Sequence, residues 1–202
     1  MGHREDLLEG ARRCLLEKGW VGTTARDIVA ASGANLASIG YHYGSKNALM
    51  MEAFLQLTED WGQEVERSLA TGIRPGAPRD ERIAAVLDAV VEGFSENRPF
   101  WQAQLEVMGQ LDRHPELKER FAQAMPAGRE GLVAMFEGVA DTDVPEEASR
   151  TSGSVYYSLF IGLWVQWLID PALVPSGAEV VAGLRRVVDG TVLAPAPAPS
   201  AK

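Results

Sequence analysis

The chain has 202 residues, of which 46% are hydrophobic and 23% are charged, and its formal net charge is −9. These values are ordinary for a soluble globular protein and allow one domain or a small domain joined to a larger one. A single cysteine excludes an intramolecular disulfide. The sequence contains no run of about 18 apolar residues, so no transmembrane helix is expected. Because the charged N-terminus also lacks the apolar segment of a secretory signal, the sequence predicts a cytoplasmic protein with no membrane partner.

The charge is distributed unevenly along the chain. Residues 1–50 contain six Lys or Arg and five Asp or Glu, so the acidic excess lies in the remainder. A nearly neutral segment can still present a locally basic face to nucleic acid. We therefore expect modest non-specific affinity for DNA from this segment, and specific binding that depends on dimerisation.

The first predicted helix covers residues 3–18. Its apolar residues recur at helical spacing and bury one face: Leu7, Ala11, Cys14 and Leu15. We interpret Cys14 as a core thiol in preference to a redox sensor. Gly19 ends the helix, and Trp20 is expected to fill the core of the N-terminal domain.

A short helix followed by a tight turn is predicted between residues 22 and 34. Thr24 can cap the helix by accepting from a free amide of the first turn. Asp27, three residues later, can accept from the amide of the cap and also faces the positive helix end. Gly33 is placed to take the positive φ that ends a helix.

A second short helix is predicted from about residue 36 to residue 43. Asn35 is its expected N-cap, Gly44 breaks it, and Ser45 caps a longer helix that runs from Lys46 to about residue 70. Two short helices joined by a turn containing glycine are typical of a helix-turn-helix. The long helix is expected to pack under this motif and then to reach into the next domain as a mechanical link.

The residues of this stretch resemble the DNA-binding domain of TetR-family transcriptional regulators. The matching elements fall in register over about thirty residues within a domain of about residues 3–54: Thr24, Ile28-Val29, Ala31-Ser32-Gly33, Tyr41-His42-Tyr43 and Ser45-Lys46-Asn47-Ala48-Leu49. Two positions depart from the pattern, since Gly40 stands where many relatives carry an aromatic residue and Tyr43 replaces the commoner Phe. The remainder of the chain resembles the family only in length and helical character.

The resemblance implies a recognition helix that lies in the major groove of DNA. If Ile39 faces the core, the short side chains of Ala37 and Ser38 face outward and allow close approach to bases. The DNA contacts so predicted are Thr24, Arg26, Asn35, Leu36, Ala37, Ser38, Tyr41, His42 and Lys46. The alternative is that Tyr41, His42 and Tyr43 only pack the domain, and for Tyr43 packing is the favoured interpretation.

The remaining sequence predicts only helices and no strands. The breaks are a segment rich in Pro and Gly at residues 71–78, His114-Pro115, residues 141–144 and Asp170-Pro171. The helices expected between them cover residues 79–95, 99–113, 115–139, 145–169 and 178–193. Pro126 and Gly128 are expected to kink the helix at 115–139 or to divide it.

The sequence therefore predicts an all-α chain with about nine helices in two parts. Residues 1–50, called the head below, form the helix-turn-helix domain. Residues 51–193, called the bundle, form a larger helical domain for ligand binding and dimerisation. Residues 194–202 form an Ala/Pro-rich tail that is expected to be disordered.

The bundle carries many large and adaptable side chains, and apolar pockets between bundled helices are common ligand sites. The predicted ligand contacts are Phe94, Trp101, Leu105, Met108, Met125, Phe136, Tyr157, Phe160 and Trp164. The alternative for each of them is plain core. The carboxylate of Glu106 is a candidate to orient a polar or cationic ligand. The alternative is that Glu106 lies on a solvent-exposed face of its helix. The same two interpretations apply to Gln102 and Gln104.

The last two predicted helices have more apolar surface than one bundle needs, which favours a two-fold dimer. The predicted interface residues are Ser154, Ser158, Gly162, Val165, Val180, Leu184, Val187 and Val188. A two-fold dimer places two recognition helices about one DNA turn or more apart and therefore implies a palindromic operator.

No constellation of residues indicates catalysis, a cofactor or a metal site. The histidines are far apart in sequence, and no phosphate-binding loop, nucleophile elbow or Cys pair is present. The sequence predicts a ligand-responsive DNA-binding regulator and no enzyme, most simply a repressor released when a small molecule binds the bundle. Two rival hypotheses are a helical binding protein or enzyme whose head is only structural, and a DNA-binding dimer with no ligand.

Overall fold

The computed structural model describes residues 3–74 and 76–190, and within these ranges every regular element is helical. The all-α prediction is therefore confirmed for the described ranges. The last helix, expected to reach residue 193, ends earlier, at Val188, and the predicted tail lies outside the described ranges. No helix within these ranges has both the length and the apolar character needed to cross a bilayer.

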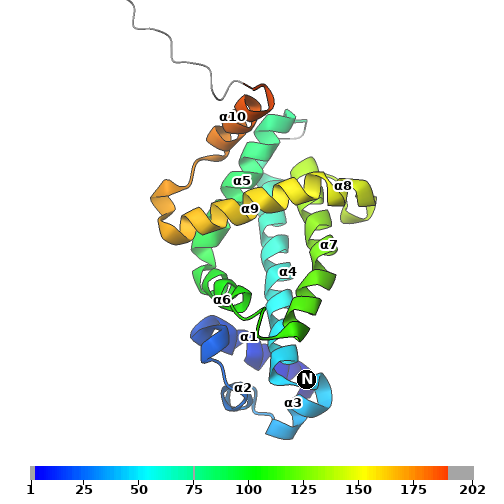
Figure 1. Cartoon of the computed structure of the whole chain (residues 1–202), viewed down its shortest axis with the longest axis vertical. Helices are drawn as coiled ribbons and strands as arrows, with labels where there is room; N and C mark the ends of the chain where they lie inside the picture. Colours follow the sequence, from blue (N-terminus) through cyan, green and yellow to red (C-terminus); the bar gives the residue numbers. More distant parts are fainter. Residues whose placement is uncertain (1–2, 75, 191–202) are drawn as a thin grey trace, which may run out of the picture.

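The head consists of three helices at one end of an elongated molecule (Figure 1). They are α1 (His3–Gly22), α2 (Ala25–Ser32) and α3 (Leu36–Tyr43). Gly19 interrupts α1 with a φ of 72° and a ψ of −178°, so the regular helix ends where the sequence predicts. Trp20 then turns into the core and is 3% exposed.

The fourth helix, α4 (Lys46–Gly72), belongs to both parts of the molecule. Leu49, Met50 and Phe54 of its first half are buried at the head, and Trp61 and Val65 of its second half are buried in the bundle. One continuous cluster of buried side chains therefore runs from the head into the bundle. This arrangement confirms the prediction of one long helix shared by both parts.

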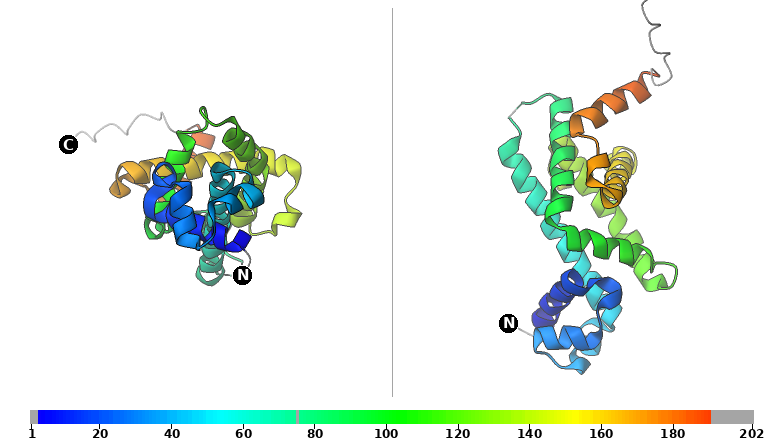
Figure 2. Two further views of the ribbon diagram at one scale, coloured as in Figure 1. Left: turned by 90° about the horizontal axis from the view of Figure 1, so that it is seen from below. Right: turned by 90° about the vertical axis from the view of Figure 1, so that its left-hand side faces the viewer.

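The bundle is built around α4. Its further helices are α5 (Arg79–Glu96), α6 (Arg98–Met108), α7 (Pro115–Glu137), α8 (Glu146–Arg150), α9 (Ser152–Ile169) and α10 (Gly177–Val188), with short 3₁₀ segments at Asp141–Asp143 and Pro171–Leu173. Helix α6 passes next to the head, and α9 crosses the bundle (Figure 1). Figure 2 shows α4 and α10 on opposite sides of α5.

Three further predicted helices differ from the observed ones. The helix expected at residues 145–169 is two helices, because Thr151 leaves the helical conformation with a ψ of −83°. The break lets α9 approach α7 closely at Gly153, where a Cβ would lie 3.0 Å from the Arg129 carbonyl oxygen. Helix α6 ends five residues early, at Met108, and α7 is not divided at Pro126.

Candidate nucleic-acid interface

Local hydrogen bonds fix both ends of the helix-turn-helix. Thr24 and Asp27 form a reciprocal capping box: the Asp27 amide donates to Thr24 Oγ1 over 3.2 Å, and the Thr24 amide donates to Asp27 Oδ2 over 2.8 Å. Gly33 closes α2 with a φ of 70°. At the start of α3 the Ser38 amide donates to Asn35 Oδ1 over 2.9 Å. The caps predicted from the sequence are therefore present, and they set the angle at which α3 leaves the turn.

Helix α3 presents an outer face that the head does not use for packing. Ile39 is 4% exposed and holds the helix to the core, whereas Leu36 is 55% and Tyr41 86% exposed. Ala37 is also exposed, and Ser38 is half-buried. An eight-residue helix whose exposed side chains share one side has the dimensions and chemistry of a major-groove reader.

The two aromatic residues that follow Tyr41 differ in their roles. His42 packs edge-on against the Tyr41 ring, with centroids 4.8 Å apart. The Tyr43 hydroxyl donates to the Arg4 carbonyl oxygen over 2.7 Å, and the Arg4 guanidinium lies 5.3 Å from the ring centroid. Burial raises the pKa of Tyr43. Tyr43 thus packs the head, as the sequence favours, while Tyr41 projects into solvent.

Basic side chains lie beside this face on two helices. Arg26 of α2 is exposed and has no hydrogen-bond or ion-pair partner among the described residues. Lys46, at the amino end of α4, donates from Nζ to the Thr23 carbonyl oxygen over 2.9 Å, and burial lowers its pKa. The carbonyl oxygen holds this ammonium close to the N-terminus of α2, where the helix dipole also favours an anion.

A salt bridge ties α2 to α1 behind the reading face. Lys18 Nζ and Asp27 Oδ1 form an ion pair, which adds to the capping role of the same carboxylate. The hydrogen bond from Lys18 and those from Thr24 hold the pKa of Asp27 well below its ordinary value of 3.8. Asp27 therefore stays ionised at neutral pH and serves structure rather than DNA contact.

Glu106 has a role that neither interpretation of the sequence anticipated. Its Oε2 accepts from the Val21 amide over 2.9 Å, which joins the end of α6 to the end of α1. The carboxylate fits over Gly19, where a Cβ would come within 2.7 Å of both oxygens. Glu106 is half-buried, and its carboxylate makes a contact between the bundle and the head. The missing side chain at Gly19 was the sequence signal that could have indicated this contact.

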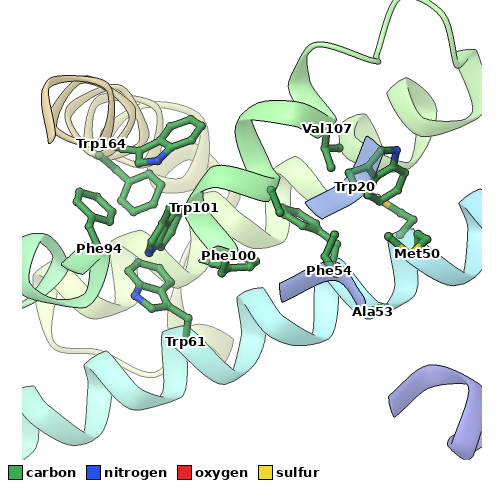
Figure 3. Close-up of a cluster of buried hydrophobic side chains, with 14 of the residues drawn as sticks. Trp20, Met50, Ala53, Phe54, Trp61, Phe94, Phe100, Trp101, Val107 and Trp164 are labelled. Atoms are coloured by element: carbon green, nitrogen blue, oxygen red, sulfur yellow. The ribbon is translucent and has the colours of Figure 1, made fainter. Parts of the chain in front are cut away.

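Most of the predicted ligand contacts pack against one another. Phe94, Trp101 and Phe160 contact each other with ring centroids 4.9 to 5.5 Å apart, and Trp164 joins them at 6.1 Å from Trp101. Figure 3 shows Phe94, Trp101 and Trp164 next to Trp61, and the rings of Phe100 and Phe54 continue from them toward Trp20. This aromatic layer fills the centre of the bundle.

The other predicted ligand contacts lie apart from this layer. Phe136 stacks on Tyr156 with centroids 4.3 Å apart. Leu105 is 52% exposed and is therefore outside the interior. Met108, Met125 and Tyr157 are half-buried.

A cleft of about 150 Å³ lies instead between α4 and α5. It is lined by Trp61, Glu64, Val65, Ser68, Ala89, Glu92, Gly93, Glu96 and Asn97. None of the residues predicted to bind a ligand lines this cleft, which the sequence analysis did not anticipate. The available signal was the alignment of acidic residues at helical spacing on two neighbouring helices.

Helix α9 leaves an unpartnered stripe on the outside of the monomer. Val155, Ser158, Gly162, Val165 and Ile169 are all exposed and recur at alternating spacings of three and four residues. On α10, Val187 is 65% and Val188 83% exposed, while Ser154, Val180 and Leu184 are half-buried. Alternating spacings of three and four are those by which helices pair along a common seam.

Two family models match most of the chain. Residues 7–53 match the model of bacterial regulatory proteins of the tetR family, and residues 77–193 match that of the C-terminal part of BetI-type transcriptional repressors. The chain belongs to the TetR family of transcriptional regulators. It is a DNA-binding transcriptional repressor with the head and bundle of that family, and the rival hypothesis of a purely structural head is not favoured.

Known proteins agree with this assignment. The chain is 26% identical over 195 residues to the HTH-type transcriptional repressor AcnR of Corynebacterium glutamicum, covering 94% of this chain and 92% of the relative. AcnR of Corynebacterium efficiens is 27% identical over 149 residues, 71% of this chain and 72% of the relative.

Solved structures share the fold. The multidrug-binding protein EbrR, solved with imidazole, superposes with a TM-score of 0.63 at 22% identity, covering 97% of this chain and 92% of the other. A transcriptional regulator from Rhodococcus sp. RHA1 gives a TM-score of 0.66 at 20% identity, covering 93% and 95%.

Proposed function

We propose that this TetR-family repressor binds a palindromic operator as a homodimer and leaves it when a small molecule binds the bundle. The observation that carries the DNA-binding part is the solvent-facing side of α3, which is held by caps at both ends and has no packing role. A preorganised helix needs little further ordering when it enters the groove.

The DNA contacts divide into readers and positioners. Leu36, Ala37 and Ser38 are short or apolar and lie in the first turn of α3, where they can approach base edges and thymine methyl groups. Thr24, Arg26, Asn35, Tyr41, His42 and Lys46 surround them and are assigned to the DNA backbone. Contacts of the second kind orient the head without reading sequence.

The dimer forms through α9 and α10 in this proposal. The stripe from Val155 to Ile169 contains two exposed small residues, Ser158 and Gly162, which let two helices approach closely. The same surface on a second copy would cover it in a two-fold arrangement, with α10 alongside. The two-fold axis then relates the two heads, and the operator shares this symmetry.

Release from DNA is a coupling between two sites. An effector weakens operator binding only by the factor with which it prefers the conformation that does not bind DNA. Two structural links can carry that preference to the head, namely α4 and the contact of Glu106 with Val21.

The first test is a fluorescence-anisotropy titration of the purified protein against duplex DNA from just upstream of its own gene, at two salt concentrations. We expect tight binding that weakens steeply with salt and is absent for a scrambled duplex. Arg26→Ala should weaken binding and reduce the salt slope by about 1. Arg67→Ala, an exposed cation on α4 that contacts only its own helix, is the matched control. Equal and weak binding to both duplexes would contradict the proposal for this operator position.

A further inference from the structure

The cleft between α4 and α5 combines an acidic rim with a lining tryptophan, Trp61, whose buried nitrogen has no hydrogen-bond partner. Two stripes of residues face each other across it, at positions 61, 64, 65 and 68 of α4 and at positions 89, 92, 93 and 96 of α5 with its C-cap, Asn97. Both stripes recur every three or four residues, so each is one side of a helix. The cleft has a volume of about 150 Å³, which is enough for a small molecule.

Three carboxylates define the rim of the cleft. Glu64, Glu92 and Glu96 are exposed, and none has an ion-pair partner among the described residues. Glu92 and Glu96 are four residues apart on one helix face, an arrangement of like charges that disfavours the helix. No set of acidic, His or Cys side chains in the described ranges has the arrangement of a metal site. The rim therefore suits an organic cation better than a metal ion.

Trp61, which lines the cleft, carries an unsatisfied donor. Trp61 is 8% exposed, and its Nε1 is buried without a hydrogen-bond acceptor. The rest of the indole is packed, edge-on against Trp101 at 4.9 Å and against Phe160 at 5.5 Å. Its nitrogen edge points away from Phe100 (Figure 3) and lies against Gly93, where a Cβ would be only 2.7 Å from Nε1. A buried donor without an acceptor is costly, so an acceptor on a ligand would be favoured here.

We propose that this cleft binds a small organic amine, whose ammonium group lies among Glu64, Glu92 and Glu96 and whose hydrogen-bond acceptor receives the Trp61 N–H. The inference rests on the proposed function in taking this amine to be the effector. Figure 2 shows α4 on the side of the bundle away from α10, so the cleft stays open in a dimer formed through α9 and α10.

The cleft is connected to the head through packed aromatic rings. A ligand that moves Trp61 also moves Trp101, which belongs to α6. The end of α6 carries Glu106, which accepts from the Val21 amide of the head. Binding in the cleft can therefore alter the position of the head without reaching the centre of the aromatic layer.

The test is isothermal titration of the full-length protein with three amines that carry acceptors at different distances, namely ethanolamine, histamine and tyramine. We expect at least one to bind with 1:1 stoichiometry per chain. For tyramine, the neutral analogue tyrosol and the acceptor-free analogue phenethylamine separate the two interactions. If tyramine is the amine that binds, replacing its charge should cost about tenfold or more in affinity and removing its acceptor about fivefold. If ethanolamine or histamine is the amine that binds, a neutral analogue and an acceptor-free analogue of that amine provide the same two comparisons.

Three variants assign binding to this cleft. Glu92→Gln should weaken the amine about tenfold, and Trp61→Phe should reduce the difference between the amine and its acceptor-free analogue. Glu66→Gln, a neighbouring exposed carboxylate on α4 that does not line the cleft, should bind as the wild type does. Binding of none of the three amines, or unchanged affinity in Glu92→Gln, would overturn the site.

The titration also separates this inference from the proposed function. An amine that binds and weakens operator binding in the anisotropy assay supports both. An amine that binds the cleft but leaves operator affinity unchanged overturns its role as effector and not the site. A protein that binds the amine but no operator overturns the proposed function and leaves the cleft assignment standing.

Discussion

The head and the bundle are stabilised by different kinds of interaction. The two short helices of the head, α2 and α3, have ends fixed by side chains a few residues away, such as Thr24 and Asn35. The centre of the bundle is a layer of aromatic rings contributed by four helices, α4, α5, α6 and α9, which span about a hundred residues of the sequence. Local hydrogen bonds specify angles, whereas large apolar side chains supply most of the free energy of folding. The DNA-reading surface is thus positioned by the weaker and more local set of interactions.

The largest loss of stability should come from removing a side chain of the aromatic layer. Trp101 is 1% exposed and contacts Trp61, Phe94, Phe100, Phe160 and Trp164. Trp101→Ala should lower the free energy of unfolding by about 3–5 kcal/mol, because it leaves a large cavity. Urea denaturation followed by circular dichroism measures this change. Gln102→Ala, an exposed neighbour on α6, serves as the control, and an equal loss in both variants would show that the layer does not carry the stability.

An intermediate effect is expected at the contact between the two regions. Gly19→Ala places a methyl group at a φ of 72° and against the Glu106 carboxylate. The backbone conformation alone should cost about 1–2 kcal/mol. Gly22→Ala is the control, since a Cβ there meets only the Lys18 Cβ at 3.6 Å.

The same contact can be tested for coupling. If Glu106 transmits a signal, Glu106→Gln should change the effect of effector on operator affinity more than it changes operator affinity itself. Anisotropy titrations with and without effector measure both quantities. Unchanged coupling in Glu106→Gln and Gly19→Ala would leave α4 as the link between the regions.

A smaller effect is expected from the cap of α2. Thr24→Ala removes the acceptor for the Asp27 amide and should destabilise the protein by about 1 kcal/mol. Operator affinity should also fall, since Thr24 is an assigned backbone contact. Thr24→Ser keeps the cap and should restore stability, so the Ser variant distinguishes the capping role from the role of the methyl group.

The smallest predicted change in stability is the one that depends on pH through Asp27. The folded-state pKa of Asp27 lies below its ordinary value of 3.8, owing to the hydrogen bonds from Lys18 and Thr24. Asp27 therefore contributes stability above about pH 4, and that contribution is lost as the pH falls through the lowered pKa. The stability difference between the wild type and Asp27→Asn should be constant from pH 5 to 8 and should shrink in more acidic buffer. Denaturation midpoints at several pH values measure it, and a constant difference at all pH values would contradict the assignment.

The two regions also differ in how far the sequence predicts them. The bounds of α3 follow from Asn35 and Gly44, residues that act on their immediate neighbours, so the sequence predicts them to the residue. The break at Thr151 accompanies the close approach of Gly153 to α7, a contact between distant residues that no local sequence pattern reveals. The aromatic residues were predicted to bind a ligand because of their size, but in the structure they pack mainly against one another. Glu106 and Trp61 gained their roles from partners more than thirty residues away.

The continuous core has a consequence for building hybrid regulators. Trp20 of the head and Phe100 of the bundle are parts of one buried cluster, and α4 runs through both regions without a break. A recombination point at residue 50 would therefore cut a single packed unit, and a transplanted head would meet a foreign α6 in place of the carboxylate that Gly19 accommodates. Chimeras that change operator choice while keeping the effector should carry matched residues at Gly19, Val21 and Glu106, or should exchange only the outer face of α3.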